Sequence, residues 1–251
     1  MFGMTVAVKT VRAETPYFVW TDAEGEKRVT VAQPDIGVAY QTFVGPDPVR
    51  WYNAPAMPAE TGQKSEPPSP QKLFQQAAAS VYTLIGKDPA HDGRVYYGSA
   101  VAITERLAIT NCHIIEDAGE DIFLGAGEGE AAEKAQLVGA DYVADRCVVA
   151  VSHLDLKPVI GVRPYDRVQV GEAVYAIGNP KMLDKSFSEG LLSGKRMMRG
   201  SRYLQTTAAI SPGSSGGGLF DAQGNLLGIT SFTLRNSQSL NFAIPAEDFW
   251  K

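Results

Sequence analysis

Between residues 81 and 244 the chain contains many short β-prone segments, separated by turn residues at fairly regular spacing. This pattern restricts the fold more than any other feature of the sequence. Short strands with frequent turn signals are typical of antiparallel sandwiches and barrels, so the sequence predicts an all-β body. The predicted strands are 81–84, 95–103, 107–110, 122–124, 148–152, 173–177, 226–230 and 242–244.

The region before this body divides into three parts. Residues 1–53 look β-rich, and two β-prone runs at 19–21 and 29–31 flank a Gly-containing turn, which predicts a hairpin. Residues 54–72 are rich in Pro, Ala, Ser and Glu, which predicts an extended linker. A short helix is predicted within 71–79, at the start of a domain that spans 73–251.

The role of residues 1–53 stays open. A segment of this length is marginal as an independent domain, so we expect it to dock on something. A small adaptor or autoregulatory flap and an inert β extension are both compatible with the sequence.

Composition excludes several classes of function. Hydrophobic content of 44% and charged content of 20% allow a sizeable core. The net charge is −5, and the absence of a basic block argues against nucleic acid as the main partner. No apolar run reaches the roughly 18 residues of a membrane span, so no membrane span is expected.

The N-terminus lacks the pattern of a secretory signal. We therefore expect a cytoplasmic location if Met1 is the true start, and a periplasmic or secreted one if a signal peptide has been removed.

The two cysteines, Cys112 and Cys147, cannot form a structural zinc site on their own, and they lack CxxC spacing. The sequence therefore predicts no metal site and no cofactor. Two buried free thiols are the favoured interpretation of the cysteines, and a disulfide between them stays open.

Residues 213–218, Gly-Ser-Ser-Gly-Gly-Gly, are the most informative segment. A serine hydroxyl needs a base to become a nucleophile, and the attacked carbonyl becomes an oxyanion that needs N–H donors. Glycines around a serine let the backbone turn tightly and direct such donors to one place. Without further evidence, a flexible Gly/Ser-rich loop is an equally good interpretation.

The chain has three histidines. His91 lies in a loop and is expected to be solvated, and His153 follows an apolar strand. His113 lies among apolar residues just past a predicted strand, where a histidine taken alone is usually a structural residue, and only segments later in the chain favour another role for it.

Three segments resemble the trypsin-like serine proteases. Residues 213–217 look like that family's GxSGG signature, 111–113 look like its histidine segment, and 144–151 look like its segment with Asp at the start of an apolar strand. The order His, Asp, Ser is that of the chymotrypsin-like class. Further matches at 174–180, 204–210 and 242–245 resemble the HtrA/Do-like branch, and together the resemblance covers about residues 73–246.

This resemblance implies two six-stranded antiparallel β-barrels, with a small β-rich extension at the N-terminus. It implies a serine endopeptidase in which Ser215 attacks, His113 is the base and Asp145 orients the imidazole. Asp141 is the alternative candidate for the acid of the triad. We favour Asp145 because the apolar run directly follows it. The N–H groups of Gly213 and Ser215 would form the oxyanion hole. Activity should fall on acidification as the histidine protonates.

The resemblance also implies a specificity pocket. Its base lies six residues before the nucleophile, at Ala209, which has no charge to pair with Arg or Lys. Side chains at Thr233 and Asn241 should narrow it, so small or medium aliphatic P1 residues are expected. The substrate backbone would add to the strand at 228–233 by β-augmentation. The predicted substrate-binding residues are Ala209, Ile210, Ser231, Phe232, Thr233 and Asn241.

Two other functions stay open at this level: an inactive protease-like domain that binds peptides, and an interaction module led by residues 1–53. The chain ends six residues past Pro245, so no PDZ domain is expected. The resemblance also makes Cys112 and Cys147 spatial neighbours. A protein or peptide substrate is the expected partner, and the oligomeric state is left undetermined.

Overall fold

The computed structural model of the chain divides into two compact units, Met1–Val49 and Arg50–Lys251, which are described separately. The residues that the structure describes are 16–21, 27–30, 40–44, 49–50, 54–62, 66–88, 94–116, 118, 121–127, 132–179, 185–198, 200–211, 213–233 and 240–250.

The first unit contains a three-stranded antiparallel sheet in the order β2-β1-β3. Its strands are β1 (Pro16–Thr21), β2 (Lys27–Thr30) and β3 (Tyr40–Val44), and β4 (Val49–Arg50) lies at the boundary. The two runs that were predicted to pair do so, with Val19 opposite Val29. The predicted turn between them lies outside the described residues.

A short helix, α1 (Pro70–Ala77), precedes the barrels and continues into a 3-10 turn, η1 (Ala78–Ser80). The Ser69 hydroxyl accepts a hydrogen bond from the Lys72 N–H at 3.3 Å, and Pro70 occupies the first turn, so both residues favour a start here. The helix therefore begins inside the segment assigned to the linker. Its buried residues, Leu73 and Ala77, anchor it.

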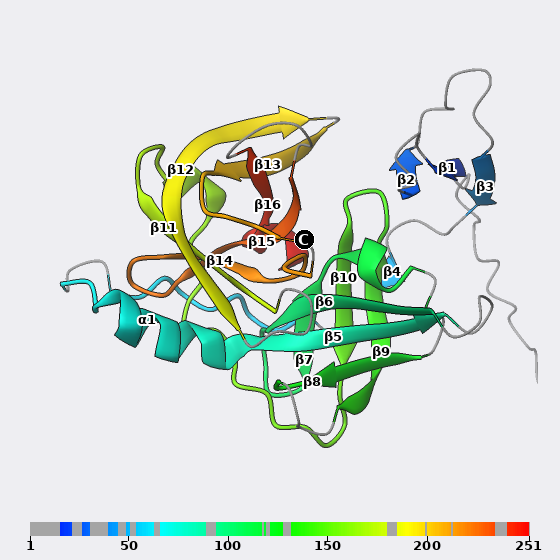
Figure 1. The fold of residues 1–251 in the computed structure, drawn as a ribbon, viewed down its shortest axis with the longest axis horizontal. Helices are drawn as coiled ribbons and strands as arrows, with labels where there is room; N and C mark the ends of the chain where they lie inside the picture. Colours follow the sequence, from blue (N-terminus) through cyan, green and yellow to red (C-terminus); the bar gives the residue numbers. More distant parts are fainter. Residues whose placement is uncertain are drawn as a thin grey trace, which may run out of the picture. The chain divides into compact units, whose positions relative to one another are not determined.

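Six antiparallel strands form the first barrel, shown in teal to green in Figure 1. The order β10-β7-β6-β5-β8-β9 closes through the pairing of β10 with β9. Side chains such as Leu84, Ile122, Leu124 and Val149 fill its interior. The strands are β5 (Val81–Asp88), β6 (Arg94–Ala102), β7 (Leu107–Thr110), β8 (Ile122–Gly125), β9 (Glu133–Asp141) and β10 (Arg146–Ala150).

The second barrel is closed in the order β11-β12-β13-β16-β15-β14 (Figure 1). Val174, Leu192, Leu204, Leu219 and Leu227 pack in its interior. The prediction of two six-stranded antiparallel barrels is thereby confirmed. The strands are β11 (Ala173–Gly178), β12 (Ser186–Met198), β13 (Ser201–Thr206), β14 (Gly218–Asp221), β15 (Leu226–Thr233) and β16 (Asn241–Pro245).

A third apolar cluster joins the two barrels. Val101 and Ile109 of the first barrel belong to it together with Ile177, Phe220 and Ile229 of the second. Because such interiors are closely packed, this cluster holds the barrels in one relative position, which a site built from both of them requires.

Part of the predicted linker lies against the second barrel. Residues 54–62 have no regular secondary structure. The Thr61 N–H donates to Oδ1 of Asn225 at 2.8 Å, and Nδ2 of Asn225 donates to the Thr61 carbonyl at 2.9 Å. The Glu60 side chain, 8% exposed, forms an ion pair with Arg163 at 3.2 Å. These contacts hold the segment in place.

Within the described residues, no helix combines the length and apolar character needed to cross a bilayer.

Candidate active site

His113 stands in a 3-10 turn, η2 (Cys112–Ile114), that directly follows β7. Its Nδ1 lies 2.9 Å from Oδ2 of Asp145, and its main-chain N–H donates to Oδ1 of the same carboxylate at 3.0 Å. The histidine side chain is 44% exposed and that of Asp145 is 23% exposed. The carboxylate therefore holds both the imidazole and the backbone that carries it, and the ring stays open to solvent.

Asp145 lies in the turn between β9 and β10 with a φ of 56°. In the described part of the chain it is the single non-glycine residue in the left-handed region. Aspartate visits this region more often than most residues, at a cost of about 1–2 kcal/mol. The rival Asp141 binds elsewhere, because its carboxylate accepts from the Ala144 N–H at 2.9 Å and pairs with Arg146.

The cysteines correct one prediction. Cys112 and Cys147 form a disulfide, with their Cα atoms 5.0 Å apart, and so they are not free thiols. The pairing of β7 with β10 explains this, because Cys147 lies opposite Thr110 and the chain turns back toward it at Cys112. The bond joins the residue before His113 to the strand that follows Asp145.

The loop of Ser215 turns on two glycines in the left-handed region, Gly213 with φ 94° and Gly216 with φ 82°. A Cβ at Gly216 would lie 1.9 Å from the Ser99 carbonyl oxygen, so only glycine fits. Ser99, on β6 of the other barrel, donates its N–H to the Ser215 carbonyl at 2.8 Å and its hydroxyl to the Gly213 carbonyl at 3.0 Å. The nucleophile loop is thus anchored to the barrel that carries His113.

Ser231, which was predicted as a substrate-binding residue, also contacts two of the three predicted catalytic residues. It occupies a β-bulge in β15, because the pairing with β16 shifts between Thr230 and Phe232. Its hydroxyl donates to Oδ2 of Asp145 at 3.0 Å, and its carbonyl accepts from the Ser215 hydroxyl at 2.9 Å. Ser231 therefore bridges the two residues, with its hydroxyl bonded to Asp145 and its main-chain carbonyl bonded to Ser215.

The predicted pocket residues are held by hydrogen bonds of their own. The Thr233 hydroxyl donates to Oδ1 of Asn241 at 2.8 Å, and Nδ2 of Asn241 donates to the Ala208 carbonyl at 2.7 Å. The N–H of Ala209 donates to the Ser188 hydroxyl at 2.7 Å. Both polar ends of the Asn241 amide are satisfied, so its side chain is fixed.

Aromatic rings surround the strand ends next to these residues. Phe232 stacks on Phe242 with ring centroids 4.9 Å apart, and Tyr203 meets Phe232 edge-on at 5.4 Å. Ile210 packs against the interior of the second barrel. The predicted pocket residues thus belong to one region of that barrel.

Asn111 belongs to the histidine segment but was not predicted as a site residue, and the structure gives it contacts to the turn of Asp145 and the loop of Ser215. It is fully buried. Its Nδ2 donates to the Asp145 carbonyl at 3.2 Å, and its Oδ1 accepts from the Gly216 N–H at 2.8 Å. The sequence signal that could have identified Asn111 is its amide at the end of an apolar strand. A side chain at such a position is often buried, and a buried amide needs hydrogen-bond partners.

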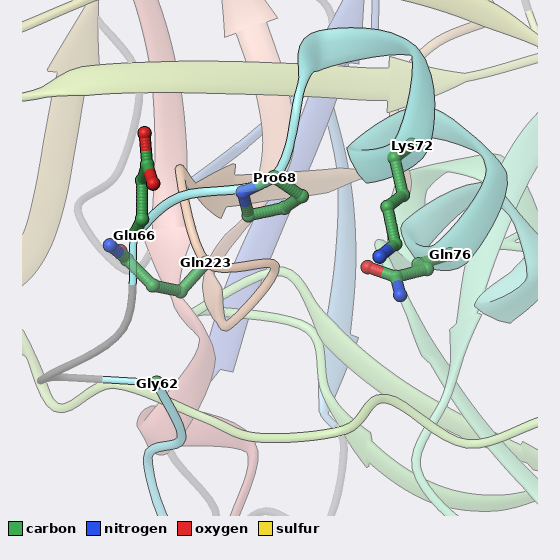
Figure 2. A pocket seen from close by; sticks show the side chains of 6 residues that line it. All are labelled: Gly62, Glu66, Pro68, Lys72, Gln76 and Gln223. Atoms are coloured by element: carbon green, nitrogen blue, oxygen red, sulfur yellow. The ribbon is translucent and has the colours of Figure 1, made fainter.

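A separate hollow lies beside α1 (Figure 2). None of the predicted site residues lines it, so it is not part of the site. Its lining residues are Gly62, Glu66, Pro68, Lys72, Gln76 and Gln223. In the part of the chain that the structure describes, no group of three or more His, Cys, Asp or Glu side chains is arranged to hold a metal ion.

Comparisons with known proteins identify relatives of the chain. The model of the trypsin-like peptidase domain matches residues 98–229. The chain is 37% identical over 154 residues to the serine protease Do-like HtrB of Bacillus subtilis, and the match covers 56% of this chain and 33% of that protein. It is 32% identical over 183 residues to the serine endoprotease DegS of Salmonella typhimurium, covering 67% of this chain and 51% of that protein.

Solved structures with the same fold include the HtrA-type protease AlgW with tripeptide. The TM-score is 0.64 at 32% identity, and the match covers 72% of this chain and 60% of that one. The serine endoprotease from Yersinia pestis matches with a TM-score of 0.60 at 29% identity, covering 72% of this chain and 64% of that one. The chain thus spans a third to two thirds of the length of these relatives.

Proposed function

The chain belongs to the trypsin-like peptidase family, with relatives of the HtrA type, and from this premise we propose that it is a serine endopeptidase. The observation that supports the proposal is that Asp145 binds His113 and the Ser231 hydroxyl, while the Ser231 carbonyl binds the Ser215 hydroxyl, so the three candidate residues are gathered in one place. These residues come from both barrels, and only the folded chain brings them together.

The proposed reaction proceeds through an acyl-enzyme. Ser215 attacks the peptide carbonyl and passes its proton to His113, which returns it to the leaving amine as the C–N bond breaks. His113 then takes a proton from water, which attacks the acyl-enzyme ester. As the C–O bond to Ser215 breaks, the proton passes to Ser215 Oγ and the carboxylic acid product leaves. Asp145 orients His113 through hydrogen bonds with its main-chain N–H and its ring Nδ1, and it stabilises the imidazolium that forms in each step.

The tetrahedral intermediate needs donors for its negative oxygen, and the N–H groups of Gly213 and Ser215 are the proposed ones. The positive φ at Gly213 and Gly216 and the contacts with Ser99 support this role, because they fix the turn that carries both donors. Loss of one such donor costs about 10²–10³ in rate.

Substrate is proposed to bind as an added strand along Ser231–Thr233, because main-chain groups of a strand recognise extended peptides of any sequence. The bulge leaves Ser231 outside the ladder with β16, and its carbonyl is the group that the Ser215 hydroxyl contacts. A peptide N–H bound at this carbonyl would compete with Ser215 and turn the hydroxyl toward His113.

We propose small or medium aliphatic residues at P1. Ala209 contributes no charge to the base of the pocket, and the hydrogen bond between Thr233 and Asn241 joins two side chains that would narrow it. Because Asn241 is also bonded to Ala208, widening the pocket by rotating the amide would break a buried hydrogen bond.

A peptide library tests both parts of this proposal. Cleavage by the wild-type chain that is lost in Ser215→Ala is expected, with Ala and Val dominant at P1. Cleavage after Arg, Lys, Phe or Tyr would refute the pocket assignment and leave the endopeptidase assignment intact. Equal cleavage by wild type and Ser215→Ala would refute the endopeptidase assignment.

A further inference from the structure

Asn111 connects the acid and the nucleophile loop through its two ends. It is fully buried between β7 and η2. Its Nδ2 donates to the Asp145 carbonyl at 3.2 Å, and its Oδ1 accepts from the Gly216 N–H at 2.8 Å. The Thr230 carbonyl shares that N–H, also at 2.8 Å. Only one orientation of the amide satisfies both partners, because Nδ2 can only donate and Oδ1 can only accept.

The two residues that Asn111 holds have unusual backbones. Asp145 has φ 56° and Gly216 has φ 82°, and both values lie in the left-handed region. Such a conformation at a non-glycine residue persists only where the surroundings support it. The Asn111 amide is a support of this kind for Asp145, because it binds the main-chain carbonyl of the residue whose carboxylate binds His113.

The position of Asn111 in the chain adds a second connection. Residue 112, which follows it, is disulfide-bonded to Cys147, two residues beyond Asp145. The disulfide therefore joins the turn of His113 to the turn of Asp145 covalently, in addition to the hydrogen bonds that Asn111 and His113 make to Asp145. The disulfide does not reach the Ser215 loop, whereas the Asn111 amide does so through Gly216.

We propose that Asn111 is a positioning residue, which fixes the backbone of Asp145 relative to the Ser215 loop and so sets the direction of the carboxylate toward His113. The proposal rests on the proposed endopeptidase function. Asn111 itself touches neither substrate nor the reacting atoms, and it acts through Asp145. Misplacing a catalytic group by about 1 Å can cost on the order of 10²-fold in rate.

A double-mutant cycle separates this role from a purely structural one. Asn111→Ala should lower kcat on the order of 10²-fold with little change in KM. In an Asp145→Ala background the same substitution should cost less than about threefold, because its effect passes through the missing carboxylate. Equal losses in the two backgrounds would overturn the proposal.

Asn225→Ala is the matched control. Asn225 is likewise a buried asparagine with both amide ends bonded, to Thr61 and Asp221, and it lies outside the proposed catalytic residues. It should lower the melting temperature and leave kcat unchanged. If it lowers kcat as much as Asn111→Ala, the loss is a general effect of removing a buried amide and the proposal fails.

Asn111→Leu is the second variant, for the case that Asn111→Ala does not fold. It keeps the approximate volume of the side chain and lacks both the donor toward Asp145 and the acceptor toward Gly216. The same loss of kcat is expected, and wild-type kcat in this variant would contradict the proposal.

A spectroscopic readout works without turnover. The chain has only three histidines, so its ¹⁵N-histidine spectrum is simple. We expect a deshielded Nδ1 proton on His113 in wild type, retained in Asn225→Ala and shifted or lost in Asn111→Ala and Asn111→Leu. An unchanged resonance in both Asn111 variants overturns the proposal. An inactive wild type with the expected spectra would refute the function and leave the positioning role standing.

Discussion

The hydroxyl of Ser231 donates a hydrogen bond of 3.0 Å to Oδ2 of Asp145, although 86 residues separate the two in the chain. This oxygen also lies 2.9 Å from Nδ1 of His113. A bulge residue in one barrel therefore helps to hold a carboxylate that belongs to the other barrel. Removing a hydrogen bond to a charged group typically costs about 1.5–3 kcal/mol.

Ser231→Ala should accordingly lower kcat at least about tenfold, since 1.4 kcal/mol corresponds to a factor of ten. KM should change little, because the main-chain carbonyl proposed to bind substrate remains. Steady-state kinetics on one peptide substrate measures kcat and KM separately and so checks this expectation. A raised KM with unchanged kcat would show that the hydroxyl serves binding and not the carboxylate.

The disulfide should contribute strongly to stability. It closes a loop of 35 residues between Cys112 and Cys147, and a loop of this length corresponds to about 4 kcal/mol in the chain-entropy model. The melting temperature of the wild-type chain should fall by on the order of 10 °C in a strong reductant. The doubly substituted chain, Cys112→Ser with Cys147→Ser, should have the melting temperature of the chemically reduced wild type, and the reductant should not change it. Identical melting of oxidised and reduced wild type would contradict this.

Removing the side chains that narrow the proposed pocket should change the specificity. Thr233→Gly combined with Asn241→Gly deletes the hydrogen-bonded pair. We expect the ratio of kcat/KM for Phe over Ala at P1 to rise at least about tenfold, because each added methylene is worth about 1–3 kcal/mol in a fitting pocket. The measurement compares two peptides that differ only at P1. An unchanged ratio would mean that these residues do not line the pocket.

Glu133 should make stability depend on pH. Partial burial opposes its ionisation, but N–H donors from Ser152, His153 and Leu154 outweigh this and lower its pKa below 4.5. A carboxylate with a lowered folded-state pKa stabilises the fold above its unfolded pKa, and this contribution is lost as the pH falls through the folded value. Glu133→Gln should therefore reduce the melting temperature at pH 7 and progressively less below about pH 4.5.

Exposed Glu105, on the turn after β6, provides the control for this experiment. Glu105→Gln removes the same charge without removing a carboxylate from the three N–H groups. The effect of Glu105→Gln on the melting temperature should be small at both pH 7 and pH 3. A difference between Glu133→Gln and wild type that persists unchanged at pH 3 would contradict the assignment.

The sequence predicted the barrels because apolar β-prone runs such as 107–110 and 173–177 became the buried strands β7 and β11. It missed β9, β12, β13 and β14. β9 and β12 contain many polar residues and are mostly half-buried or exposed, with few fully buried positions, so they lack the apolar signal that marks a buried strand. Their partners in the closed barrel, and not their own composition, hold them as strands.

The candidate triad could be proposed from the sequence because its three segments resemble a known family. The support around it was harder to predict. The disulfide was disfavoured because cysteine count alone says nothing about distance, whereas strand register places Cys147 near Cys112. Asn111 and the left-handed Asp145 depend on contacts across the fold, which no local pattern encodes.

The most direct test of the central claim is covalent labelling of Ser215 by a fluorophosphonate, located by mass spectrometry. The wild-type chain should be labelled at Ser215, alone or with an added peptide that occupies the substrate strand. Ser215→Ala should not be labelled, and His113→Ala should be labelled orders of magnitude more slowly because its base is missing. A folded wild-type chain that stays unlabelled under both conditions, or is labelled equally fast in His113→Ala, would contradict the account.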